Sequence, residues 1–110
     1  MCHDWGMEII HAQSRTEEFL RELDKRTAVK VDKLFAILAR DGNKIAFPKS
    51  RHIRNGIFEL RVVGERQIRI FCAFHNGKAY ILHIFIKKTW KIPNKEIEYA
   101  EKIKNLLALI

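Results

Sequence analysis

The side chains best suited to chemistry are two arginines and a glutamate in neighbouring β-type runs, residues 57–63 and 67–74. Side chains alternate across a strand, so Glu59 and Arg61 share one face of the first run. Placing the apolar residues of both runs on one core, with a three-residue turn between them, sets Arg61 opposite Arg69. The three side chains then lie together on the face away from the core. Because guanidinium groups stay charged and bind phosphate through paired hydrogen bonds, the arrangement predicts a phosphate site.

Further basic side chains flank these two runs. Lys87 and Lys88 end a third β-type run. A loop expected at residues 43–55 carries the candidates for RNA binding, which are Lys49, Arg51 and His52. Two of the candidates have plain structural alternatives, since Arg61 could serve only as an ion-pair partner of Glu59, and His52 could be a solvated surface side chain.

The chemistry that suits these groups is cleavage of RNA. Its ribose 2′-hydroxyl must lose a proton, the charge on the pentavalent phosphate must be neutralised, and the leaving 5′-oxygen must gain a proton. Guanidinium groups fixed on a sheet supply the second requirement. Glu59 or a desolvated lysine could act as the base, and His52 or a lysine as the acid.

The elements that must position these groups begin with a meander of three antiparallel strands. The third run, residues 79–88, follows an Asn-Gly pair that is typical of a two-residue hairpin turn. Counting from that turn places Lys88 on the face of Arg69, whereas Lys87 follows His83 and Phe85 toward the helices. We expect His83 to be a hydrogen-bonded structural histidine. Cys72 falls on the apolar side of its strand, where a buried thiol is the usual interpretation.

Helices are expected before and after the meander. Residues 14–17 form a capping box that begins a first helix ending near Lys25. Thr27 can cap a second helix, which ends at residues 41–42, and Asn94 can cap a last one. With a first strand at residues 5–11, the order becomes strand, two helices, three strands, helix. This order predicts a single α+β domain over residues 1–110, in which a helical hairpin and a C-terminal helix pack on one face of a mainly antiparallel, twisted sheet.

Charge is distributed unevenly along the 110 residues. Residues 1–44 hold 8 basic and 8 acidic side chains, whereas residues 45–110 hold 13 basic and 5 acidic ones, so the net charge of +8 lies entirely in the second part. A basic half favours a polyanionic partner, nucleic acid first and an acidic protein second. Neither the histidines nor the cysteines show metal-ligand spacing, and we expect no cofactor, no metal and no membrane span. The expected location is the cytoplasm.

The motifs of the second half resemble those of a known toxin family. Phe-Glu-Leu-Arg, Ile-Arg-Ile-Phe and Leu-His-Ile-Phe-Ile-Lys-Lys-Thr precede a proline and Glu-Ile-Glu-Tyr-Ala, in order and at the expected spacing. These segments occupy residues 58–61, 68–71, 82–89, 93 and 96–100. Across residues 45–105 the chain is similar to the HigB-like, phage-related branch of the RelE toxin superfamily.

The resemblance implies a metal-independent endoribonuclease that cuts messenger RNA on the ribosome. It implies a HigA-like helix-turn-helix antitoxin as partner, with DNA bound only through the antitoxin complex. By the resemblance, Arg69 contacts the scissile phosphate, while Arg61, Lys87 and Lys88 complete the catalytic set. Ile84 replaces a frequent glycine of the family and would narrow the cleft if it faced the arginines. The alternatives from the residues alone are a non-catalytic RNA-binding module and a regulatory role on DNA.

Overall fold

The computed structural model describes residues 7–45 and 50–107, which form three α-helices and a five-stranded sheet. Trp5, Pro48 and Lys49 lie outside the described residues, so the predicted role of Lys49 is not addressed by the structure. The elements in chain order are β1 (Glu8–His11), α1 (Ser14–Arg21), α2 (Lys25–Asp41), a 3₁₀ turn η2 (Gly42–Lys44), β2 (Ser50–Arg54), β3 (Ile57–Val62), β4 (Ile68–His75), β5 (Lys78–Ile86) and α3 (Asn94–Leu106).

The sheet is mixed, with the strand order β1-β5-β4-β3-β2. β1 runs parallel to β5, and the other neighbouring pairs are antiparallel. The predicted α+β class and the three-stranded meander β3-β4-β5 are therefore confirmed. The meander occupies the middle of the sheet, which explains why its strands carry most of the buried residues.

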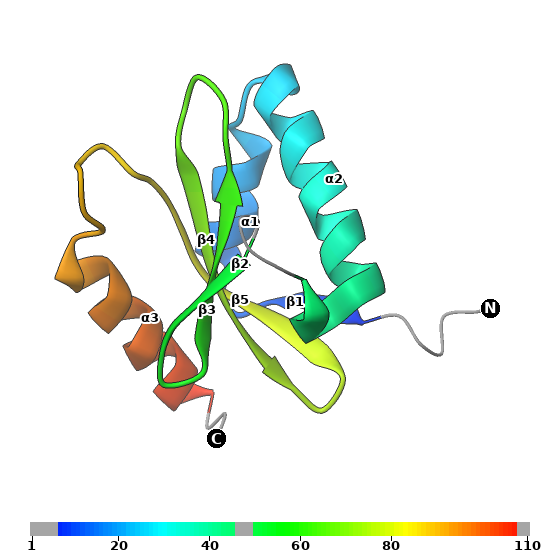
Figure 1. Ribbon diagram of the computed structural model, residues 1–110, viewed down its shortest axis with the longest axis vertical. Coiled ribbons are helices and arrows are strands. Elements are labelled where there is room, and N and C mark those ends of the chain that lie inside the picture. Colours follow the sequence, from blue (N-terminus) through cyan, green and yellow to red (C-terminus); the bar gives the residue numbers. More distant parts are fainter. Residues whose placement is uncertain (1–6, 46–49, 108–110) are drawn as a thin grey trace.

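Helices cover both faces of the sheet, so the expectation that all of them pack on one face is wrong. Figure 1 shows α1 and α2 on one side and α3 on the other. Against α1 and α2 lies the larger apolar core, which includes Leu60, Ile70 and Leu38. Under α3 lies a second one, built around Phe71, Phe85 and Ala100. Because alternate residues of β4 and β5 are apolar on both faces, each face requires a cover.

A β-bulge in β5 changes which way its last residues point. Cys72 pairs with Ile81, but Phe71 pairs with His83, so β5 carries one extra residue at this point. The extra residue reverses the alternation counted from the hairpin. His83 and Phe85 consequently face α3, on the same side as Arg69, and the predicted orientation toward the first core is wrong. Ile84 belongs to the first core instead and does not face the arginines.

The segment predicted as a loop at residues 43–55 contains the edge strand β2, which pairs with β3. Asn55 and Gly56 join the two strands with positive φ angles of 51° and 74°. This is the backbone conformation that a two-residue hairpin turn requires and that Asn-Gly adopts readily. The basic side chains of residues 51–54 are therefore held on a strand.

The ends of the helices differ from the predicted ones. Gln13 precedes α1 and Pro93 precedes α3, neither with a side-chain cap, so Ser14 and Asn94 lie inside their helices. Asp24, not Thr27, caps α2, and its carboxylate accepts a hydrogen bond from the Thr27 backbone N–H at 3.0 Å. Thr27 lies in the first turn of α2, where its hydroxyl donates a hydrogen bond to the Asp24 carboxylate at 2.7 Å.

Candidate nucleic-acid interface

The strand register brings three arginines and one glutamate together on the α3 side of the sheet. Arg61 pairs with Arg69 across β3 and β4, as the turn between these strands predicted. Arg51 of β2 pairs with Glu59 of β3 in the neighbouring row. The sequence prediction placed Arg51 in a loop and so missed its position beside Glu59.

Glu59 is the centre of this cluster. Its side chain is 1% exposed, and its Oε1 lies 3.3 Å from the Nε of both Arg51 and Arg61. Its Oε2 lies 3.1 Å from the Nε of Arg69. A carboxylate shared by three guanidinium groups leaves an excess of positive charge directed at the surrounding surface. Glu59 is therefore bound to the arginines and not presented to solvent.

The three arginines lie at different depths. Arg69 is 6% exposed and also donates to the backbone oxygen of Ile68 at 3.2 Å. Burial lowers the pKa of Arg69, an effect that Glu59 opposes and Arg61 strengthens, although a guanidinium remains protonated at neutral pH. The side chain of Arg51 is 48% exposed, whereas Arg61 is intermediate. Arg51 and Arg61 are thus the members of the cluster with the most surface available to a ligand.

A cleft of about 420 Å³ opens beside the cluster. Four of the predicted site residues contribute to it from three elements or loops: Arg51, His52, Arg61 and Lys87. The remaining lining residues are Ile53, Trp90, Lys91, Ile92 and Ile97. We call this the first cleft. Its basic side chains come mainly from the sheet, and most of its apolar side chains come from the start of α3 and the loop before it.

A second cleft, of about 610 Å³, lies next to the first and shares Lys87 and Trp90 with it. It is completed by Gln67, Arg69, Lys88 and Thr89. Lys87 reaches both clefts because the bulge in β5 returns it to the side of Arg69, and its backbone N–H donates to Gln67 at 2.7 Å. The expectation that Lys87 lies on the face opposite Arg69 is therefore wrong. Neither cleft is lined by an aspartate or glutamate among the described residues.

Comparison with known families now identifies the chain at the family level. Residues 18–105 match the model of the family described as Phage derived protein Gp49-like (DUF891). The chain belongs to this family. The family is associated with RelE-type, toxin-like proteins, which agrees with the resemblance to the RelE superfamily seen in the sequence. No curated protein matches the chain.

His83 and His52 of this Gp49-like protein have structural contacts. The His83 Nε2 lies 2.8 Å from the Glu96 Oε1, and its ring lies against Tyr99, so the predicted hydrogen-bonded role is confirmed under α3. His52 lines the first cleft, yet its ring packs against the edge of Phe58, which contacts the first core. Within residues 7–45 and 50–107, no group of three or more histidine, cysteine or acidic residues is placed to hold a metal ion.

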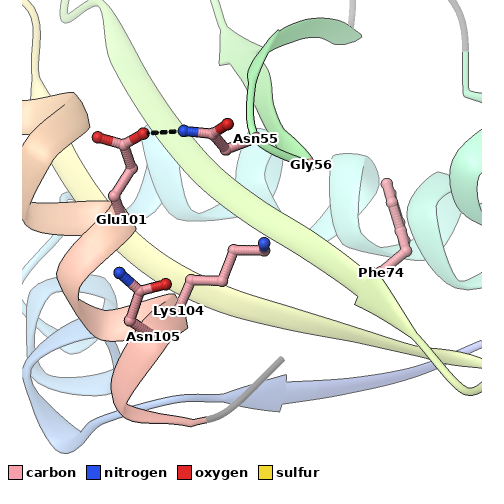
Figure 2. Close-up of a pocket in the computed structure, with 6 residues that line it drawn as sticks. All are labelled: Asn55, Gly56, Phe74, Glu101, Lys104 and Asn105. Atoms are coloured by element: carbon pink, nitrogen blue, oxygen red, sulfur yellow. Dashed lines mark hydrogen bonds between the residues drawn. The ribbon is translucent and has the colours of Figure 1, made fainter. Parts of the chain in front are cut away.

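A further pocket, of about 550 Å³, lies at the other end of α3 (Figure 2). Its acidic side chain, Glu101, accepts hydrogen bonds from Arg54 and Asn55. These bonds lower the pKa of Glu101 and fasten the β2–β3 turn to α3. We interpret this pocket as structural, because its acidic group is occupied by the turn.

The sequence prediction missed several residues of the clefts, among them Trp90 and Lys91. The available signal for Trp90 was a tryptophan between Thr89 and Lys91, in a turn directly after the basic strand end. In the part of the chain that the structure describes, no helix is long and apolar enough to cross a membrane.

Proposed function

We propose that this Gp49-like protein is a HigB-like toxin of the RelE type, an endoribonuclease that cleaves messenger RNA on the ribosome. The observation that carries the proposal is the first cleft, where Arg51, Arg61 and Lys87 converge without a neighbouring carboxylate on its lining. The family's association with toxin-like proteins supports it. The proposal includes a HigA-like helix-turn-helix antitoxin as partner, and binding to DNA only through the complex with it.

In this proposal the arginines stabilise the charge that develops on the scissile phosphate. The half-exposed guanidinium of Arg51 carries five N–H groups and can donate to a ligand beyond its contact with Glu59, while Arg61 adds its positive charge to the first cleft. Arg69, beneath them, faces the second cleft together with Lys88. Because Glu59 already holds these guanidinium groups in place, they need little reorganisation when the phosphate becomes pentavalent.

The proton transfers fall to the lysines of the clefts. Glu59 was one candidate for the base, but its side chain is buried among three guanidinium groups, which block its access to the 2′-hydroxyl. Lys87 borders both clefts, so it can meet the attacking and the leaving side of one phosphate. A lysine acts as acid when protonated and as base when it has lost its proton.

Primer extension on transcripts from cells that express the protein tests the proposal. We expect growth arrest and messenger RNAs cut at discrete positions. Arg61→Ala should reduce the cleavage rate about a hundredfold, as loss of one donor to a developing oxyanion typically does. The matched control is Arg54→Ala, because Arg54 is also a partly exposed arginine but pairs with Glu101, away from both clefts.

Two outcomes would contradict the proposal. Intact transcripts at protein levels that stop growth would leave a non-catalytic RNA-binding module as the function of the same surface. Equal losses in the Arg61 and Arg54 variants would show that general basicity, and not the cleft, matters. A small helix-turn-helix gene beside this one would support the antitoxin partner.

A further inference from the structure

Trp90 is the most exposed large apolar side chain among the described residues, at 92%. It lies in the loop between β5 and α3, which extends beyond the end of the sheet in Figure 1. Leaving an indole in water forgoes the free energy of burying a large apolar surface. A ligand that covered this side chain would gain that free energy on binding.

The position of Trp90 relates it to the clefts. Trp90 and Lys87 line both of them, so Trp90 stands where the first cleft meets the second. A single strand of nucleic acid with phosphates in both clefts would pass this point. The bases of such a strand carry flat aromatic faces that stack on an exposed indole.

The loop that carries Trp90 is held at both ends. Before it, the Lys87 backbone N–H donates to Gln67. After it, Ile92 packs against the second core. Within it, the Thr89 hydroxyl donates to the backbone oxygen of Lys91. A loop fixed in this way presents the indole with less conformational freedom to lose on binding.

We propose that Trp90 is a stacking platform for one nucleobase of the bound RNA, next to the phosphate that the first cleft receives. The inference rests on the proposed function and adds a residue that senses the base as well as the backbone. The lining favours a nucleic acid over an acidic protein segment, because it combines basic side chains, which attract phosphates, with an exposed indole, on which a base can stack. The basic side chains beside Trp90 are Lys88, Lys91 and the arginines. Binding of an acidic protein alone is an outcome that the test distinguishes.

The experiment uses the fluorescence of Trp90 itself. The chain has two tryptophans, so Trp5→Phe leaves Trp90 as the sole indole. This protein is titrated with a short single-stranded 2′-O-methyl RNA, which lacks the attacking hydroxyl, and separately with inorganic polyphosphate. We expect the RNA to quench the fluorescence strongly, and polyphosphate to leave it nearly unchanged while competing for the clefts.

Substitutions then separate stacking from apolar bulk. In anisotropy measurements with labelled RNA, Trp90→Ala should weaken binding about tenfold, in line with the usual contribution of one stacked base. Trp90→Phe should retain most of the affinity, whereas Trp90→Leu should resemble the alanine variant. Leu106→Ala is the control, since Leu106 is 73% exposed but lies at the end of α3, outside both clefts.

The outcomes separate the inference from the proposed function. RNA binding without quenching, or with equal affinities of the wild type and Trp90→Ala, would overturn the stacking role and leave the nuclease proposal standing. Equal quenching by polyphosphate would do the same. Binding of acidic peptides but not of RNA would overturn the stacking role and would also count against the nuclease proposal. The nuclease proposal itself is decided by primer extension with the wild-type protein, independently of this titration.

Discussion

Glu59 and Leu60 are neighbours in β3 and are equally buried, at 1% and 0% exposure, yet they face opposite sides of the sheet. Leu60 packs among the apolar residues under α1 and α2. Glu59 lies between guanidinium groups from three strands. One face of the sheet thus excludes water with hydrocarbon, whereas this part of the other face is filled with charges.

The difference shows how the fold combines stability with a basic surface. An apolar core gains free energy from each buried methylene group and does not depend on an exact partner. A buried ion cluster gains little net free energy, because desolvation offsets the attraction, but it fixes its members in place. The second arrangement suits a phosphate site, where position matters more than the free energy of folding.

The largest expected effect comes from removing the charge of Glu59. Glu59→Gln keeps the shape of the side chain but leaves Arg69 buried beside two other cations. We expect the free energy of unfolding to fall by about 4 kcal/mol, which is typical when one partner of a buried ion pair is lost. Urea unfolding followed by circular dichroism measures the change.

Leu60→Ala is the matched control on the other face, with an expected loss of about 3 kcal/mol from the cavity that it leaves. Inorganic phosphate should restore part of the stability of Glu59→Gln, because an anion can bind the uncompensated arginines of the folded state. Phosphate should raise the stability of Leu60→Ala no more than it raises that of the wild type. Equal responses of both variants to phosphate would show that the charged face is merely another part of the core.

A smaller effect should distinguish the arginines by depth. Arg69→Ala removes a buried guanidinium, whereas Glu59 keeps Arg51 and Arg61, so we expect a loss of about 2 kcal/mol. Arg51→Ala should cost less than about 1 kcal/mol, because its side chain is half exposed. Affinity for single-stranded RNA should change in both variants. Thermal unfolding of the Arg69→Ala and Arg51→Ala proteins measures both losses. A lower stability of Arg51→Ala than of Arg69→Ala would contradict the ranking by depth.

The smallest effect concerns a titratable group on the apolar face. Burial without a charged partner raises the pKa of the Cys72 thiol from 9.0 to about 12. Above pH 9 the unfolded chain loses this proton while the folded chain keeps it, so stability falls between pH 9 and pH 12. The expected loss is about 1 kcal/mol at one pH unit above 9. Cys72→Ala should lack this component, which denaturation at a series of pH values would detect; parallel curves would contradict the assignment.

The sequence by itself determined the meander, the pairing of Arg61 with Arg69 and the first core. These features follow from local alternation and from turn lengths, which the chain encodes within a few residues of each strand. The helix α2 and its end at Asp41 were equally readable, because a regular apolar spacing stops at a glycine.

Tertiary structure alone decided the rest. One extra residue in β5 reversed the faces of Phe85 and Lys87, and alternation counted from a turn cannot reveal such a bulge. The edge strand that holds Arg51 exists because β3 offers it a pairing partner, since its own residues are too polar to signal a strand. Glu59 was readable as a possible ion-pair partner, but its burial depends on strands distant in the sequence. The two clefts likewise depend on tertiary structure: the first arises where β2 and β3 meet the start of α3 and the loop before it, and the second where β4 meets that loop.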